Sequence, residues 1–450
     1  MLRAFLVGVC RFLLSAFFRR IEVVGRENLP QDGSLLFALN HPNALIDPLF
    51  ILCLSGRRVS FLAKEPLFRM PLISIFVRAF ESLPVYRTSD GADPANNRKM
   101  MRAAADLLTR GNALALFPEG TTHSDPTLKR FRSGAARIAL SARALGDTPV
   151  RIVPAALYYE KKESFRSRAV LAFGEPILVP VVTLDENGES PRDEGARLTE
   201  TLQEAVSSIM PTSDTAEGLV LAENAERIFS AALRDTPNAC PKAAAQSDEA
   251  SEISLATRMS LRRKMIDAYL RLLGSQSEKL ADLVTRIEEL EAALASFGLN
   301  IDAAPQSPGT WRKKRLPRIF QAVLLFPLAL PGIILHFPAY FLVRFLTLRY
   351  GGETHDVIAT SKLMGGMLFF PLTWLSAAGA LAYSQSRPLL ILLGLLGPLL
   401  MWAGVTFMAL LGSVTRSIAR SRGAARSGLD WQAIQKTRAT IAEEIAALIQ

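Results

Sequence analysis

The sequence predicts an α/β fold, a sandwich of helices around a mixed sheet, followed by a helical region and a C-terminal transmembrane helical hairpin. Short apolar runs alternate with helical patterns between residues 20 and 180, which is typical of α/β domains. Two stretches without charged residues, 363–386 and 388–415, each exceed the roughly 20 residues that cross a bilayer core. The chain has 450 residues, so we expect two or three structural units.

The alternating region supplies the elements of the predicted domain, residues 21–210. Apolar runs bounded by turn residues are predicted as strands: Ile21–Val24, Ser34–Leu39, Val59–Leu62, Asn112–Phe117, Val150–Leu157 and Ala169–Phe173. Helical periodicity predicts helices at Leu49–Leu54, Pro71–Phe80, Ala95–Arg110, Ser133–Leu145 and Arg197–Met210.

The N-terminal segment 1–20 is apolar but carries arginines at intervals. Arg3, Arg11 and Arg19 fall within one arc of a helical wheel, which indicates an amphipathic helix. Its uncharged runs are too short to span a bilayer, and no small-residue cleavage site follows, which argues against a cleaved signal peptide. We expect a helix in the membrane interface with its basic face towards the headgroups; a helix packed on its own domain is the alternative.

The middle of the chain, 211–310, is predicted as a helical insert with linkers. Helical patterns cover 219–233 and 255–297, and the stretches 235–250 and 300–310 have the composition of linkers. The insert is interpreted as a spacer that positions the preceding domain on a membrane, and a partner-binding helix is the other reading.

A membrane domain is predicted over 311–415. Transmembrane helices are expected at 363–384 and 388–411, joined by a short polar turn. The preceding apolar run, 319–346, carries several prolines, which predicts a broken or re-entrant segment. A basic cytosolic tail with a terminal helix is expected over 416–450.

Charge placement predicts the orientation of this membrane domain. Basic residues precede the apolar region at 312–318 and follow it at 416–426, and basic flanks favour the cytoplasmic side. Both flanks can be cytoplasmic only if an even number of crossings separates them. We therefore expect a multi-pass membrane protein with two crossings and its α/β domain on the cytoplasmic face.

The composition narrows the class of partner. A formal net charge of +10 suits nucleic acid, an anionic membrane or anionic substrates. The basic clusters flank apolar spans and are not interleaved with stacking aromatics, which argues against nucleic acid. The cysteines Cys10, Cys53 and Cys240 are far apart, so neither a disulfide framework nor a cysteine-rich zinc site is expected.

The first motif with chemical content is Asn40–Pro48, which follows a predicted strand. His41 stands at a strand-to-helix corner, because Pro42 suits the first turn of a helix. Asp47 could hold the imidazole in one tautomer, which would let His41 take a proton from a substrate hydroxyl.

Two further motifs could bind an anion. The turn Phe117–Ser124 exposes backbone donors and hydroxyl groups, and Lys129, Arg130 and Arg132 follow it shortly before a predicted helix N-terminus. The short apolar strand Leu83–Arg87 ends in an arginine, whose guanidinium can bind phosphate through two hydrogen bonds.

The order of these motifs resembles the phospholipid/glycerol acyltransferase family. The blocks that carry the resemblance are Asn40–Asp47, Pro84–Arg87, Phe117–Thr121 and Ile152–Ala155. The H-P-N-x-L-x-D-P form is most similar to the fungal-type glycerol-3-phosphate/dihydroxyacetone-phosphate acyltransferase subgroup. Five residues instead of four separate His41 from Asp47, so contact requires His41 to lie outside the helix or a local bulge.

The resemblance implies a glycerolphosphate-acyltransferase-like fold and direct acyl transfer to a hydroxyl group. His41 would be the general base, oriented by Asp47, and acyl-CoA or acyl-carrier protein would be the co-substrate, with no metal or redox cofactor. The acceptor would be glycerol 3-phosphate or 1-acylglycerol 3-phosphate, in phosphatidic acid and phospholipid biosynthesis at an anionic phospholipid membrane. The implied substrate-binding residues are Arg87, Glu119, Gly120, Thr121, Lys129, Arg132 and Pro154.

Thr122 stands where many members of that family carry arginine, and Lys129 or Arg132 could replace the missing contact. Two alternatives stay open: an acyltransferase for another lysolipid or an amino lipid, and a non-catalytic lipid-binding or remodelling membrane protein.

Overall fold

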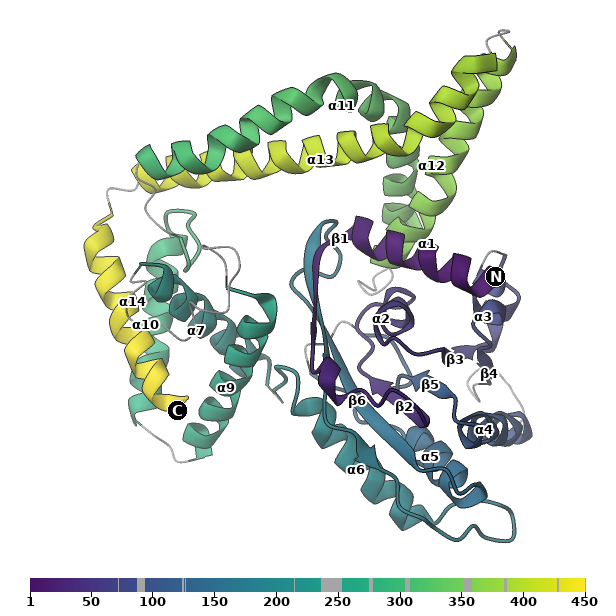
Figure 1. Cartoon of the computed structure of the whole chain (residues 1–450). Coiled ribbons are helices and arrows are strands. Elements are labelled where there is room, and N and C mark those ends of the chain that lie inside the picture. Colours follow the sequence, from purple (N-terminus) through teal and green to yellow (C-terminus); the bar gives the residue numbers. More distant parts are fainter. Residues whose placement is uncertain are drawn as a thin grey trace. The chain divides into compact units, whose positions relative to one another are not determined.

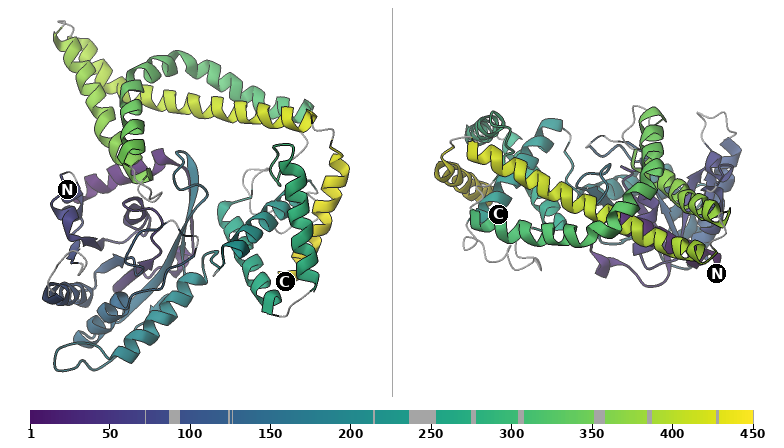
Figure 2. Two further views of the ribbon diagram at one scale, coloured as in Figure 1. Left: turned by 180° about the vertical axis from the view of Figure 1, so that it is seen from behind. Right: turned by 90° about the horizontal axis from the view of Figure 1, so that it is seen from above.

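The computed structural model describes residues 1–71, 73–86, 94–123, 125, 127–213, 215–235, 253–274, 278–303, 308–350, 358–383, 387–426 and 429–449. These residues form two compact units, which Figure 1 and Figure 2 show and which are described separately below. The first unit consists mainly of Met1–Ala216 together with Leu255–Arg263. The second contains most of the remaining helices.

An eight-stranded mixed sheet organises the first unit. Its strands are β1 (Phe18–Val24), β2 (Ser34–Leu39), β3 (Val59–Lys64), β4 (Leu83–Val85), β5 (Ala113–Leu116), β6 (Val150–Tyr159), β7 (Ser167–Phe173) and β8 (Ile177–Leu178). Their order is β1-β7-β6-β2-β5-β3-β4, and β8 pairs with β6. Strands β6 and β7 pair antiparallel, whereas β2 is parallel to both β5 and β6, so the predicted mixed sheet is confirmed.

Helices cover both faces of this sheet (Figure 1). They are α1 (Leu2–Phe17), α2 (Ile46–Leu54), α3 (Ile73–Ala79), α4 (Pro94–Thr109), α5 (Gly134–Leu145) and α6 (Arg192–Ser207), with short 3-10 helices η1 (Arg26–Asn28) and η2 (Glu65–Phe68). Leu36 and Ala38 of β2 share a core with buried residues of α4, α5 and α6. Every residue of β2 is buried, because this strand is central and covered on both faces.

Helix α1 packs on its own domain through a buried stripe that includes Leu6, Cys10 and Leu14. Arg11 and Arg19 are exposed and Arg3 is half-buried, and the interfacial placement of this helix stays a prediction. Arg3 donates a hydrogen bond to the Val59 carbonyl at 2.7 Å, and Arg11 donates one to the Cys53 carbonyl at 3.3 Å. These two hydrogen bonds hold α1 against its own domain. The outward residues of α1 include large apolar side chains, namely Leu2, Phe5 and Phe12.

The first unit also includes the beginning of helix α9 (Leu255–Gly274), which the predicted domain 21–210 leaves out. The carboxylate of Glu22 accepts hydrogen bonds from the backbone N–H groups of Leu255 and Ala256, at 3.1 and 2.9 Å. Arg258 forms an ion pair with Glu160 at 3.5 Å. The helix N-terminus is therefore held by a carboxylate from the edge strand β1, an arrangement that the helix dipole favours.

The second unit contains a helical bundle of α7 (Ala216–Asp235), α9, α10 (Glu278–Ala295) and α14 (Trp431–Leu448). Apolar residues from all four helices line a shared pocket of about 40 Å³. Arg286 of α10 pairs with Glu444 of α14, and the buried Arg438 donates to the Ile301 carbonyl at 2.6 Å. The terminal helix of the predicted tail 416–450 therefore packs against a helix of the predicted insert 211–310.

The apolar helices of the second unit are α11 (Pro308–Tyr350), α12 (Ile358–Tyr383) and α13 (Arg387–Arg426). Helix α11 runs without a break through Pro317, Pro327, Pro331 and Pro338 and bends along its length in Figure 1. The predicted break at 319–346 is therefore wrong, because proline bends this helix and neighbouring helices support it. A side chain at Gly332 would meet the Leu400 backbone at 2.1 Å, so α11 and α13 touch closely there.

Two described helices are long and apolar enough to cross a membrane, judged by length and composition alone: Arg315–Arg349 and Leu396–Thr415. The predicted span 363–384 lies largely within α12 and stays a prediction, as does re-entry of the segment 319–346. The turn expected between the predicted spans falls at 384–386, outside the described residues.

Candidate active site

The candidate site begins at the end of strand β2. Asn40 is buried, and its side-chain amide pairs with the Leu157 backbone in both directions, donating at 3.0 Å and accepting at 2.7 Å. The amide thus continues the β2–β6 pairing by one residue beyond the strand. This fixes the exit of the chain from the sheet and therefore the position of His41.

His41 and Asp47 meet as predicted. The His41 Nδ1 atom lies 2.9 Å from Asp47 Oδ2, and the Asp47 side chain is fully buried. Helix α2 begins at Ile46, so His41 lies outside the helix, and Ala44 between them takes a positive φ of 31°. This turn, sparsely populated for alanine, accommodates the extra residue of the spacing.

Asp47 has two further donors that fix its carboxylate. The Asn43 backbone N–H donates to Oδ2 at 2.7 Å, and the Tyr159 hydroxyl donates to Oδ1 at 2.6 Å. Sequence reasoning missed Tyr159, since it ends β6, far along the chain, and no local motif connects it with Asp47.

The His41 ring is largely covered by its neighbours. Phe117 stacks on it with ring centroids 3.9 Å apart and an interplanar angle of 14°, and 16% of the His41 side chain remains exposed. Because Nδ1 faces Asp47, the Nε2 atom is the nitrogen free to act as a base. Phe117, the first residue of the Phe117–Glu119 motif, therefore covers one face of the His41 ring.

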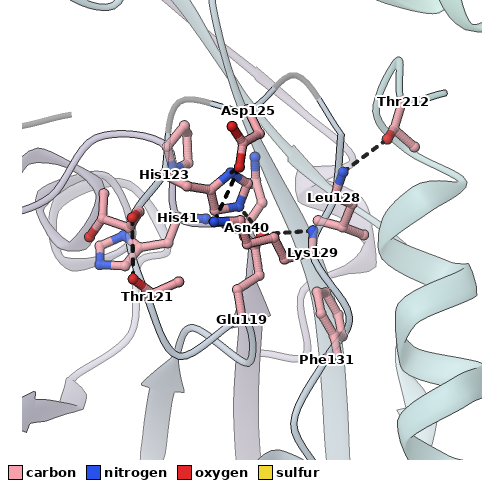
Figure 3. Close-up of polar contacts among 12 residues, drawn as sticks. Asn40, His41, Glu119, Thr121, His123, Asp125, Leu128, Lys129, Phe131 and Thr212 are labelled. Carbon is pink, nitrogen blue, oxygen red and sulfur yellow. Dashed lines mark hydrogen bonds and ion pairs between the residues drawn. The ribbon is translucent and has the colours of Figure 1, made fainter. Parts of the chain in front are cut away.

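Glu119 is a buried brace beside His41 (Figure 3). Its Oε1 accepts the backbone N–H of His41 at 2.8 Å, and its Oε2 accepts the backbone N–H of Lys129 at 3.1 Å. The ring of His123 also contacts Oε2. Both carboxylate oxygens thus bind donors of the protein, which gives Glu119 a structural task that the sequence did not reveal.

The predicted anion-binding residues gather around the turn that follows Glu119. Gly120 has a φ of 71°, and a side chain there would meet the Nε atom of Arg132 at 2.8 Å, so the Arg132 side chain lies directly against the turn. Lys129 Nζ pairs with Asp125 at 3.1 Å, and the Thr121 hydroxyl donates to the Thr122 carbonyl at 3.3 Å. Two cationic side chains therefore stand near the turn.

The remaining predicted residues have different outcomes. Arg87 lies outside the described residues. Pro154 lies within β6, opposite Ala38 of β2, and its ring packs against Gly174. Proline has no backbone N–H to donate. Pro154 lies where the strand that pairs with β6 on the side away from β2 changes from β8 to β7, which explains why a central strand tolerates proline here. No described contact joins it to His41, so its role as a wall of the site stays a prediction.

Two lysines near the site were not predicted. Lys64 ends β3, which is parallel to β5, so it lies at the same carboxyl edge of the sheet as the Glu119 turn. Lys162 donates to the Pro42 carbonyl at 3.1 Å from the loop between β6 and β7. Finding Lys64 would have required the register of the strands, and finding Lys162 would have required the conformation of the loop.

The described cysteines do not suit nucleophilic chemistry. Burial raises the pKa of Cys10 to about 12 and that of Cys53 to about 11, so both thiols stay protonated at neutral pH. A histidine base held by a carboxylate, next to cationic side chains, can instead activate an alcohol of an anionic substrate.

Comparison with known proteins agrees with this chemistry. Residues 20–158 match the model of the Acyltransferase family. These residues form an acyltransferase domain. It contains His41, Asp47, Glu119 and the cationic side chains beside the turn.

Individual relatives cover different shares of the chain. Glycerol-3-phosphate O-acyltransferase 1 of Saccharomyces cerevisiae is 24% identical over 81% of this chain, which spans 59% of that relative's length. A chloroplastic 1-acyl-sn-glycerol-3-phosphate acyltransferase of Arabidopsis thaliana is 29% identical over 31% of this chain and 36% of its own length. The crystal structure of a 1-acyl-sn-glycerophosphate acyltransferase of Thermotoga maritima matches 45% of this chain and 78% of that chain, with 22% identity and a TM-score of 0.34.

Proposed function

We propose that this protein is a membrane-bound O-acyltransferase that transfers a fatty acyl group from acyl-CoA or acyl-carrier protein to glycerol 3-phosphate or 1-acylglycerol 3-phosphate. The observation that carries the proposal is the His41–Asp47 contact of 2.9 Å beside a turn flanked by Lys129 and Arg132. A base next to cations suits an alcohol that also carries a phosphate group.

The proposed reaction is a direct transfer. His41 Nε2 takes the proton of the acceptor hydroxyl while the alkoxide oxygen attacks the thioester carbonyl carbon. The tetrahedral intermediate expels the thiolate, which takes the proton back from the imidazolium, leaving an ester and a free thiol. The thioester is already activated, so positioning and general base catalysis suffice, and the reaction needs no metal or redox cofactor.

Within this proposal, the extent of the matches favours glycerol 3-phosphate as the acceptor. The yeast relative, named a glycerol-3-phosphate acyltransferase, matches 81% of this chain, including helices beyond the acyltransferase domain. The Arabidopsis relative, named for the 1-acyl acceptor, matches only 31%. The product in the first case would be lysophosphatidate.

The acceptor can be tested with the purified full-length protein in detergent. The protein receives acyl-CoA or acyl-carrier protein with glycerol 3-phosphate or with its 1-acyl form, and His41→Ala serves as the inactive control. We expect product with glycerol 3-phosphate. Product with neither acceptor and either donor, from folded protein, would contradict the proposal.

The surfaces of the apolar helices support membrane association. Helix α11 exposes large apolar side chains, among them Phe320, Leu324 and Phe341. Such a surface is stable in hydrocarbon and costly in water. The exposed apolar residues of α1, namely Leu2, Phe5 and Phe12, support a second membrane contact at the interface.

The second unit supports an even number of crossings between α10 and α14. These two helices belong to one bundle, and Arg315 near the start of α11 binds the Ser417 hydroxyl near the end of α13 at 2.8 Å. The connections 303–308 and 426–431 are too short, at about 3.5 Å per residue, to cross a core about 30 Å thick. Both ends of the apolar region then lie on one side, and its basic flanks favour the cytoplasm.

This topology can be tested with single cysteines in a cysteine-free variant. Cysteines at Ser296 and Gln432 should react with a membrane-impermeant reagent from the cytoplasmic side, and a cysteine at Ser386 from the opposite side. Labelling of Ser296 and Gln432 from opposite sides would contradict the even number of crossings.

A further inference from the structure

The second carboxylate oxygen of Asp47 has a single hydrogen-bond donor among the described residues. Oδ2 receives the Asn43 backbone N–H and faces the His41 ring, whereas Oδ1 accepts only the Tyr159 hydroxyl, at 2.6 Å. The Asp47 side chain is fully buried, so water does not solvate Oδ1. A buried carboxylate oxygen without a donor is costly, which makes the Tyr159 hydroxyl important for the charged form of Asp47.

The Tyr159 ring is fixed by aromatic neighbours. It stacks on Phe18 at the start of β1, with centroids 5.6 Å apart, and meets Phe50 of α2 edge-on at 5.7 Å. Its backbone is paired with Ala169 of β7. The hydroxyl is thus held in place by three elements of the fold before any substrate binds.

We propose that Tyr159 is a positioning residue of the reaction, which keeps the Asp47 carboxylate in the one orientation that presents Oδ2 to His41. This inference rests on the proposed function, since it assigns Tyr159 a part in the same base. A carboxylate can turn about its Cβ–Cγ bond, and a donor fixed at Oδ1 prevents that rotation. His41 then keeps its proton on Nδ1 and its lone pair on Nε2, as a general base requires.

The charge state of the phenol supports this role. Burial, together with the neighbouring Asp47 carboxylate, raises the pKa of Tyr159 well above its ordinary value. The hydroxyl therefore stays protonated and donates to Asp47 throughout the neutral range.

The first test compares Tyr159→Phe with the matched variant Tyr158→Phe. The neighbouring Tyr158 hydroxyl accepts a hydrogen bond from Arg262 at 2.6 Å and does not touch Asp47. We expect Tyr159→Phe to lower kcat roughly 10- to 100-fold with the acceptor KM within about twofold, since one hydrogen bond to a charged group is lost. Tyr158→Phe should leave both constants within about twofold of wild type.

A second test separates action through Asp47 from a general structural role. In the double variant Asp47→Asn/Tyr159→Phe, the loss of kcat should equal that of Asp47→Asn alone, because Tyr159 has no carboxylate left to orient. Independent losses that multiply would overturn the proposal, and so would a Tyr159→Phe enzyme with wild-type kcat.

A spectroscopic measurement keeps the inference testable even if the proposed activity is not found. The proton on His41 Nδ1 gives an NMR signal in protein labelled with ¹⁵N-histidine, assigned by its absence in His41→Ala. The chemical shift of this signal should change in Tyr159→Phe and stay the same in Tyr158→Phe. If Tyr159→Phe does not fold, difluorotyrosine at position 159 provides a stronger donor and should move the signal in the opposite direction. A signal unmoved by every change at Tyr159 would overturn the proposal.

Discussion

Two buried carboxylates stand beside His41, and they hold different parts of it. Asp47 faces the imidazole ring through Oδ2, whereas Glu119 accepts the backbone N–H of the same residue. The first contact sets the tautomer of the ring, and the second sets the position of the loop that carries it. Asp47 therefore acts on the reactivity of His41, and Glu119 acts on its position. Loss of Asp47 should remove catalysis from a folded site, whereas loss of Glu119 should loosen the site itself.

The largest effect is expected for Asp47→Asn. The amide keeps the shape of the side chain but can present N–H to His41 Nδ1, which favours the tautomer with its proton on Nε2. We expect kcat to fall by about 10³-fold or more in a variant that still folds, with a lower melting temperature because the amide leaves the buried Asn43 N–H without its acceptor. Steady-state rates and thermal unfolding of the same preparation check this, and a variant that retains a tenth of the wild-type kcat would contradict it.

A smaller loss of rate, with a loss of stability, is expected for Glu119→Gln. The amide can accept at only one oxygen, although Glu119 receives donors from His41, Lys129 and His123. Leaving a buried donor unpaired costs about 1–3 kcal/mol, so we expect a lower free energy of unfolding of the domain. Chemical unfolding of wild type and variant measures the difference. Unchanged stability with abolished activity would instead indicate that Glu119 acts on the substrate.

The cations near the turn should affect binding more than chemistry. Arg132→Ala should raise the acceptor KM roughly tenfold and leave kcat within a few-fold, since one charged contact to phosphate is removed. Arg130→Ala, an exposed neighbour in the same loop, is the matched control and should change neither constant. Equal effects of both substitutions would show that overall charge, and not the position against Gly120, matters.

The smallest effect concerns stability at low pH, away from the base. Burial raises the pKa of Glu160, but the hydrogen bonds and charge of Arg168 outweigh it, so the pKa lies below its usual value of 4.5. A depressed folded-state pKa contributes stability above the unfolded-state pKa, and this stability is lost as the pH falls through the folded-state pKa. Glu160→Gln should therefore have a lower free energy of unfolding than wild type at pH 7, and this difference should narrow below about pH 4. A difference in the free energy of unfolding that does not depend on pH would contradict this prediction.

The sequence predicted the elements that depend on local pattern. Strand β2 was predicted with its exact bounds, because an uninterrupted apolar run between turn residues specifies a buried strand. The His41–Asp47 contact was also predicted, with the condition that His41 lie outside the helix, which the start of α2 at Ile46 meets.

Features that depend on distant parts of the chain could not be predicted. Tyr159 reaches Asp47 only because β6 pairs beside β2, and Glu119 braces His41 only because β5 is the other neighbour of β2. Helix α14 completes a bundle with α10 across the whole apolar region, which no local pattern reveals. The prolines of α11 wrongly predicted a break, because packing, and not propensity, decides whether such a helix breaks.

The central claim is that His41 removes the proton of the acceptor hydroxyl. It is tested most directly by single-turnover acyl transfer to glycerol 3-phosphate in wild type and His41→Ala, with acceptor binding measured by calorimetry on the same proteins. We predict a transfer rate reduced by at least about 10³-fold in His41→Ala, with acceptor affinity within a few-fold of wild type. Transfer by His41→Ala within tenfold of the wild-type rate would contradict the account.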